Sequence, residues 1–73
     1  MPDTDAIVLT HVADGIATVT LNRPEKRNAM NRAVVDGLRE AFDDVRDDPA
    51  ARVVVLRGAG SLFSSGIDTT FLF

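Results

Sequence analysis

Cysteine is absent from this sequence of 73 residues, and histidine occurs once, as His11. A chain without cysteine forms no disulfide framework and no thiolate metal site, and one histidine with no second one nearby provides no ligand pair. We therefore expect no metal site. The absence of cysteine is also compatible with a reducing compartment.

Long apolar runs and a strong excess of one charge are also missing. No run approaches the roughly 20 apolar residues of a membrane span, and residues 1–5 lack the positively charged start of a signal peptide. The formal net charge is −3 and no basic stripe is present, which argues against nucleic-acid binding. We predict a cytoplasmic protein that binds neither nucleic acid nor membrane. Its length allows one small domain of marginal stability.

The first third of the chain has the composition of paired strands. Residues 7–12 and Ile16–Leu21 are rich in β-branched side chains, and Asp14 and Gly15 between them supply positive φ at a tight turn. Pro24 ends the second strand because proline lacks the ladder donor and biases the residue before it away from helix. This pattern predicts a β-hairpin followed by a polar loop.

Residues 31–48 have apolar side chains at helical spacing, which predicts one amphipathic helix. The apolar positions are Val34, Val35, Leu38, Ala41, Phe42 and Val45. Asn31 is the expected N-cap, and the Asp-Asp-Pro segment at residues 47–49 is the expected stop. Gly37 weakens this helix by about 1 kcal/mol relative to alanine.

Residues 53–56 (Val-Val-Val-Leu) show no alternation, which is typical of a strand covered on both faces in a mainly parallel sheet. If Ile16–Leu21, the helix and this strand form a right-handed βαβ unit, the loops after both strands leave at the same edge of the sheet. Ligands of open α/β sheets bind at that edge. We therefore predict an α/β fold, a β-hairpin followed by a βαβ unit, in which residues 22–30 and 58–68 line one crevice.

Gly66 lies directly before an expected helix. Backbone N–H groups at a helix start have no intrahelical acceptor, and the helix dipole adds partial positive charge, so an amide there stabilises negative charge on a substrate oxygen. Taken alone, however, a glycine before a helix is an ordinary turn. Asp68 is expected to be the N-cap rather than a general acid or base, and Phe71, Leu72 and Phe73 are expected to form one buried helix face.

Other catalytic motifs do not fit. Ser64 and Ser65 are not in a G-x-S-x-G motif, and His11, expected on a strand surface, gives a serine triad little support. Gly-Ala-Gly at residues 58–60 begins like G-x-G-x-x-G, but Phe63 stands where the third glycine belongs. The sequence therefore contains no nucleotide-binding motif.

Four segments occur in a specific order and spacing. They are Thr-Leu-Asn-Arg-Pro at 20–24, Asn-Ala-Met at 28–30, Val-Val-Val-Leu-Arg-Gly-Ala-Gly at 53–60 and Phe-Ser-Ser-Gly-Ile-Asp at 63–68. These segments resemble the enoyl-CoA hydratase/isomerase, or crotonase, superfamily. The resemblance implies that residues 1–73 are the N-terminal portion of a single crotonase-like domain, a spiral of ββα repeats. Members usually assemble as homotrimers or dimers of trimers.

The resemblance implies an acyl-CoA enzyme, an enoyl-CoA hydratase or isomerase. The backbone N–H of Ile67 matches one of two oxyanion-hole donors that stabilise a thioester enolate. The residues implied to bind substrate are Lys26, Arg27, Asn28, Ala29, Ser65, Gly66, Ile67 and Asp68. Among them, Lys26 and Arg27 would face the phosphates of coenzyme A. Coenzyme A is part of the substrate, so no separate cofactor is expected.

Many members have alanine where this chain has Ile67, and the larger side chain narrows the acyl pocket. The second oxyanion donor and the acid/base carboxylates of the family lie beyond residue 73, so we expect residues 1–73 alone to be inactive. The alternative is a noncatalytic small α/β module that binds an acyl-CoA or a protein partner through the same crevice. The choice between hydration and isomerisation, and the acyl chain, depend on residues outside this sequence.

Overall fold

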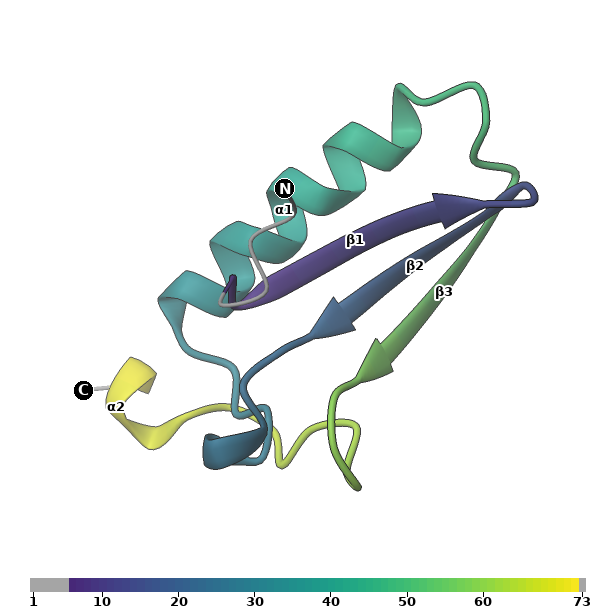
Figure 1. The fold of residues 1–73 in the computed structure, drawn as a ribbon. Coiled ribbons are helices and arrows are strands. Elements are labelled where there is room, and N and C mark those ends of the chain that lie inside the picture. Colours follow the sequence, from purple (N-terminus) through teal and green to yellow (C-terminus); the bar gives the residue numbers. More distant parts are fainter. Residues whose placement is uncertain (1–5, 73) are drawn as a thin grey trace.

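The computed structural model describes residues 6–72. The strands are β1 (Val8–Ala13), β2 (Ile16–Leu21) and β3 (Val53–Gly58), and the helices are η1 (Pro24–Lys26), α1 (Arg32–Arg46) and α2 (Thr69–Leu72) (Figure 1). This order confirms the predicted hairpin, long helix and third strand. The short 3₁₀ helix η1 lies in a segment that the sequence predicts only as a polar loop.

The three strands form one sheet in the order β1-β2-β3. β1 and β2 are antiparallel, with Val8 opposite Leu21, and β2 and β3 are parallel, with Ile16 opposite Val53. Because β2 and β3 are parallel, both end at the same edge, and the loops that follow them lie together there (Figure 1). We call residues 22–31 the first loop and residues 59–68 the second loop.

The hairpin turn has the backbone that its sequence predicts. Asp14 and Gly15 have φ angles of 54° and 81°, and positive φ at both central residues is the requirement of a type I′ turn. This turn fixes the register of β1 against β2. It therefore also fixes which residues of β2 face the helix.

Helix α1 covers β1 and β2 on one face of the sheet (Figure 1). Alternate residues of a strand point to one face, and Ala17 and Val19 of β2 are fully buried against Ala41 and Val45 of α1. Gly37 explains the close approach of α1 to β1, since a Cβ at this position would lie 2.8 Å from Val8 Cγ2. The glycine that weakens the isolated helix therefore permits its packing.

The start of α1 is capped as predicted. The Asn31 side-chain oxygen accepts a hydrogen bond from the Val34 backbone N–H at 3.0 Å. This bond satisfies one of the N–H groups that a helix start leaves without an intrahelical acceptor. The helix ends at Arg46, within two residues of the stop predicted from the Asp-Asp-Pro segment at 47–49.

Strand β3 is uncovered on both faces within residues 6–72. Val53, Val54, Val55 and Leu56 are 58%, 45%, 43% and 40% exposed, because α1 lies over the other two strands (Figure 1). The predicted cover on both faces is thus not supplied by the described residues. An exposed apolar strand at a sheet edge favours association with further polypeptide.

Three further features complete this description. No helix among residues 6–72 is long and apolar enough to cross a lipid bilayer. The predicted buried face of Phe71, Leu72 and Phe73 lies outside the side chains that the structure describes. His11, which the sequence places on a strand surface, is exposed on β1.

Candidate active site

The two loops are joined by a short parallel bridge between Met30 and Ile67. The Met30 N–H donates to the Gly66 carbonyl at 2.8 Å, and the Asp68 N–H donates to the Met30 carbonyl at 2.9 Å. Segments that are far apart in sequence therefore lie side by side at the carboxyl edge of the sheet. This confirms the prediction that the loops after β2 and β3 meet.

The bridge directs the N–H of Ile67 away from the first loop. In a trans peptide the N–H points opposite to the carbonyl of the preceding residue, and the chain has no cis peptide bond among its described residues. Since the Gly66 carbonyl accepts from Met30, the N–H of Ile67 faces the other side. Pairing in the bridge thus leaves the Ile67 N–H without a partner on the first loop.

The neighbouring amides all have acceptors. The Ser65 N–H donates to the Arg27 carbonyl at 3.0 Å, and the Gly66 N–H donates to Ser64 Oγ at 3.0 Å. The Asp68 N–H is used in the bridge. Within residues 6–72, the Ile67 N–H has no hydrogen-bond acceptor. Between residues 65 and 68 it is the one backbone N–H without an acceptor in the described structure.

The buried side chain of Asn28 is hydrogen-bonded to the backbone of both loops. Its side chain is 1% exposed, and Nδ2 donates to the carbonyls of Ala59 and Leu62, each at 2.9 Å. Its Oδ1 accepts from the Arg23 N–H at 2.8 Å. The resemblance implies that the Asn28 backbone lines the site, but the sequence gives no sign of this side-chain role. The backbone of Asn28 is in the left-handed region, with a φ of 55°. Asparagine tolerates this region better than most residues, which favours asparagine at this position.

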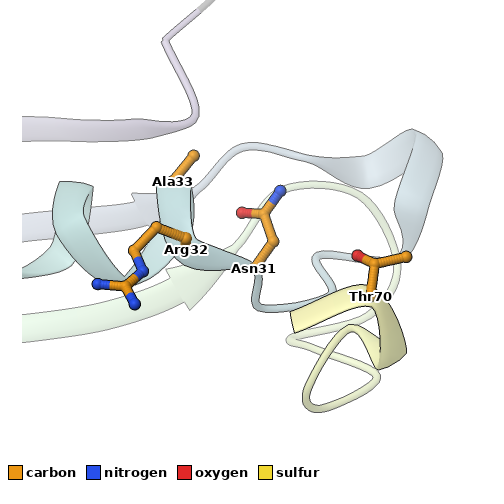
Figure 2. A pocket seen from close by; sticks show the side chains of 4 residues that line it. All are labelled: Asn31, Arg32, Ala33 and Thr70. Atoms are coloured by element: carbon orange, nitrogen blue, oxygen red, sulfur yellow. The ribbon is translucent and has the colours of Figure 1, made fainter. Parts of the chain in front are cut away.

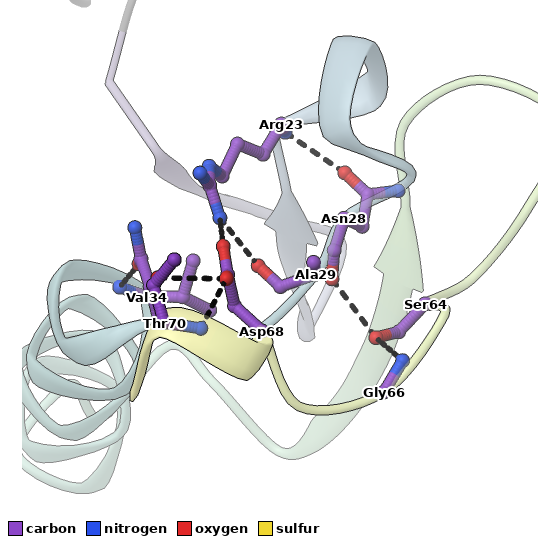
Figure 3. Close-up of polar contacts among 9 residues, drawn as sticks. Arg23, Asn28, Ala29, Val34, Ser64, Gly66, Asp68 and Thr70 are labelled. Atoms are coloured by element: carbon purple, nitrogen blue, oxygen red, sulfur yellow. Dashed lines mark hydrogen bonds and ion pairs between the residues drawn. The ribbon is translucent and has the colours of Figure 1, made fainter. Parts of the chain in front are cut away.

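An ion pair links the first loop to the start of α2. Arg23 Nη1 donates to Asp68 Oδ2 at 3.2 Å and to the Ala29 carbonyl at 2.9 Å (Figure 3). The two charged side chains are 16% and 18% exposed. Asp68 Oδ1 also accepts from the Thr70 N–H at 3.0 Å and from Thr70 Oγ1 at 2.7 Å. Asp68 is therefore the cap of α2, as predicted, and Arg23 is a partner that the sequence reading missed.

These contacts make the cap sensitive to acid. Hydrogen bonds from the Thr70 side chain and backbone, followed by the bond from Arg23, lower the pKa of Asp68. A lowered folded-state pKa contributes stability above the ordinary carboxyl pKa of about 4, and this contribution is lost as pH falls through the folded-state value. We expect the Thr70 amide chemical shift to follow this protonation in an NMR titration, and Asp68→Asn to remove the titration. A Thr70 shift that titrates with a midpoint at or above the ordinary carboxyl pKa of about 4 would contradict this prediction.

The predicted phosphate-binding residues are exposed on the first loop. Neither Lys26 nor Arg27 has a carboxylate within ion-pair distance in the part of the chain that the structure describes. Arg27 lines a shallow cavity of about 370 Å³, together with Pro24 and Gly60. Lys26 is not part of its lining. Both cations are thus available to a ligand, but only Arg27 borders this cavity.

A second cavity, of about 280 Å³, lies between the start of α1 and α2. It is lined by Asn31, Arg32, Ala33 and Thr70 (Figure 2). None of these residues belongs to the predicted site, and Ile67 lines neither cavity. Residues 6–72 also contain no cluster of three or more histidine, cysteine, aspartate or glutamate side chains that could hold a metal ion. The candidate site is therefore limited to the unpaired Ile67 N–H on the second loop and the two exposed basic side chains, Lys26 and Arg27, on the first.

Comparisons with known proteins identify the family of this chain. The profile of the family described as enoyl-CoA hydratase/isomerase matches residues 11–72. The chain is 48% identical over 64 residues to the mitochondrial Δ(3,5)-Δ(2,4)-dienoyl-CoA isomerase of Mus musculus, which is 88% of this chain and 20% of that protein. It is 46% identical over 61 residues to the hydroxycinnamoyl-CoA hydratase-lyase of Pseudomonas fluorescens, which is 84% of this chain and 22% of that protein.

Solved structures show the same similarity. The crystal structure of an enoyl-CoA hydratase from Mycobacterium tuberculosis H37Rv matches with a TM-score of 0.87 and 37% sequence identity, over 93% of this chain and 27% of that chain. This confirms the crotonase-like fold expected from the sequence. The chain spans about a fifth of the length of the curated relatives it matches. With a family match over nearly all of its residues, the chain belongs to the enoyl-CoA hydratase/isomerase family.

Proposed function

We propose that this chain supplies one half of an oxyanion hole in an acyl-CoA hydratase or isomerase. The observation that carries the proposal is the N–H of Ile67, which lacks an acceptor in the described structure while its neighbours are paired. The family to which the chain belongs supports a CoA thioester as the substrate class. In this proposal residues 1–73 form the N-terminal portion of a single crotonase-like domain.

The chemistry needs a donor of this kind. When a proton leaves the carbon next to a thioester, or a nucleophile adds to the conjugated double bond, negative charge develops on the thioester oxygen. A backbone N–H fixed in advance stabilises that charge by roughly 3 kcal/mol, as the loss of other oxyanion donors indicates. Ile67 acts through its amide in this proposal, and its 59% exposed side chain borders the acyl group.

The charged end of the substrate is assigned to the first loop. We propose that Lys26 and Arg27 contact the phosphates of coenzyme A, with the backbone of Asn28 and Ala29 beside them. On the second loop, Ser65 adjoins the thioester. Coenzyme A arrives as part of the substrate, so the proposal requires no separate cofactor. A cytoplasmic location and assembly as a homotrimer or a dimer of trimers complete the proposal.

Lys26 gives a testable consequence of this arrangement. We expect Lys26→Ala to weaken coenzyme A binding by no more than about 1 kcal/mol, because the side chain is exposed and solvent screens its charge. The effect should shrink at high ionic strength. Calorimetric titration of the protein as its gene encodes it, at low and high salt, measures both. Arg39→Ala is the control, since it removes one positive charge from an exposed position on α1. Equal affinity of Lys26→Ala and wild type at low salt would remove Lys26 from the site.

The proposed function itself is tested by turnover of two preparations. The protein as its gene encodes it should hydrate or isomerise an enoyl-CoA, followed by the change in conjugated enoyl absorbance. Residues 1–73 by themselves should show no turnover, because the resemblance implies that the second oxyanion donor and the acid/base carboxylates lie beyond residue 73. They should also aggregate or unfold in a broad thermal transition, because β3 is exposed on both faces. A stable monomer of residues 1–73 that binds acyl-CoA without turnover would instead support the noncatalytic module. A sharply melting monomer with turnover would contradict the predicted inactivity and instability of residues 1–73.

A further inference from the structure

The segment that carries the Ile67 amide has little side-chain packing of its own. Ser65 and Ile67 are exposed, and Gly66 has no side chain. Gly66 also has a φ of 101°, and a Cβ built on it would meet nothing within 4 Å. Packing therefore does not hold this stretch of backbone. Its direction depends on hydrogen bonds.

Within residues 6–72, the hydroxyl of Ser64 is the one side-chain group that is hydrogen-bonded to the backbone of residues 65–67. Ser64 Oγ accepts from the Gly66 N–H at 3.0 Å and donates to the Asn28 carbonyl at 2.8 Å (Figure 3). A hydroxyl has one donor and two acceptor sites, so both bonds form together. Through them the turn is tied to Asn28, whose side chain is buried between the two loops.

We propose that Ser64 is a positioning residue for the oxyanion donor, an inference that rests on the proposed function. Its hydroxyl holds the peptide between Ser65 and Gly66. The next peptide carries the Ile67 N–H, and Met30 holds the carbonyl of that peptide. Glycine populates many backbone conformations, so when the hydroxyl is lost the bond from the Met30 N–H alone holds this peptide, and the Ile67 N–H samples a wider range of directions. Ser64 acts without touching the substrate.

The kinetic consequence is specific. An oxyanion donor stabilises the transition state because its direction is fixed before charge develops. Ser64→Ala removes two hydrogen bonds, of which the one from the Gly66 N–H bears on the donor. It should therefore lower kcat by roughly fivefold to tenfold, the value of that one bond, while KM changes by less than about twofold. Gly66 is an exposed residue, so we expect water to replace the lost bond to its N–H in this variant. The Asn28 carbonyl loses its bond from Ser64, but the three side-chain bonds of Asn28 remain, so we expect the fold to persist.

Two variants complete the kinetic test in the protein as its gene encodes it. Ser64→Thr keeps a hydroxyl at the same position and should retain most of the wild-type kcat. Thr69→Ala removes a hydroxyl from an exposed residue at the start of α2 and should leave kcat and KM unchanged. A readout independent of activity is hydrogen exchange of the Gly66 amide, which should become faster in Ser64→Ala and stay unchanged in Thr69→Ala.

The outcomes separate this inference from the proposed function. Wild-type kcat in Ser64→Ala, or a loss that Ser64→Thr does not restore, overturns the positioning role. Unchanged Gly66 exchange in Ser64→Ala overturns it as well. Removal of the Ile67 N–H without loss of kcat overturns the proposed function instead. Lower kcat and faster Gly66 exchange in Ser64→Ala, both restored in Ser64→Thr, support the inference.

Discussion

Ile67→Pro should lower kcat by roughly a hundredfold or more in the protein as its gene encodes it, because proline removes the oxyanion donor. The bridge between the loops uses the Gly66 carbonyl and the Asp68 N–H, with no bond from the Ile67 N–H. The substitution therefore removes no hydrogen bond of the described structure. Steady-state kinetics with an enoyl-CoA substrate measure the effect.

Ile67→Ala is the matched control for this prediction. It keeps the N–H and shortens the side chain, so it should change the preference for acyl-chain length more than the chemical step. Proline also restricts the residue before it, and Gly66 has a positive φ. A second variant with an ester in place of the Gly66-Ile67 amide removes the donor without that restriction. Similar kcat values in the ester, alanine and wild-type proteins would contradict the backbone assignment.

Asn28→Ala should destabilise the loop edge by roughly 3 kcal/mol, because it removes three hydrogen bonds from a buried position. Two carbonyls on the second loop and one N–H on the first lose their partner. Alanine is also less suited than asparagine to a φ of 55°. Urea denaturation gives the change in the free energy of unfolding. Exchange of the Ser65 amide, which bonds to the first loop, reports whether the loops separate.

Two further substitutions isolate the cause. Asn28→Gly removes the same hydrogen bonds but tolerates positive φ, so it should recover only the backbone part of the loss. Glu25→Ala changes an exposed residue of η1 on the same loop and should leave stability within about 0.5 kcal/mol. If the free energy of unfolding of Asn28→Ala equals that of the wild-type protein, the Asn28 side chain does not hold the two loops together.

The secondary structure follows from local signals in the sequence. Asp14 and Gly15 supply the positive φ that the hairpin turn requires. The apolar spacing of residues 31–48 and the cap at Asn31 define α1. Each of these signals lies within one continuous segment, so it can be recognised without knowledge of distant contacts. The meeting of the two loops also follows, because parallel strands end at one edge.

The side-chain contacts of the site depend on the folded chain. Arg23 pairs with Asp68 across 45 positions of sequence, and Asn28 reaches the Leu62 carbonyl across 34. No local pattern indicates such partners, because strand pairing brings them together. Residues 53–56 are a further example. Their apolar run indicates a strand that requires cover on both faces, but α1 packs on β1 and β2 and leaves this strand exposed (Figure 1).

The sequence by itself therefore determined the three strands and the long helix, their order and the family to which the chain belongs, but not the short helix η1. The resemblance already indicated the Ile67 amide, and the tertiary structure supplied the physical reason why this amide differs from its neighbours. All non-proline residues carry an N–H, and the chemistry of Ser65, Gly66, Ile67 and Asp68 does not distinguish their amides. Only the pairing of the second loop with Arg27, Met30 and Ser64 occupies three of these donors and leaves the fourth, on Ile67, without an acceptor in the described structure.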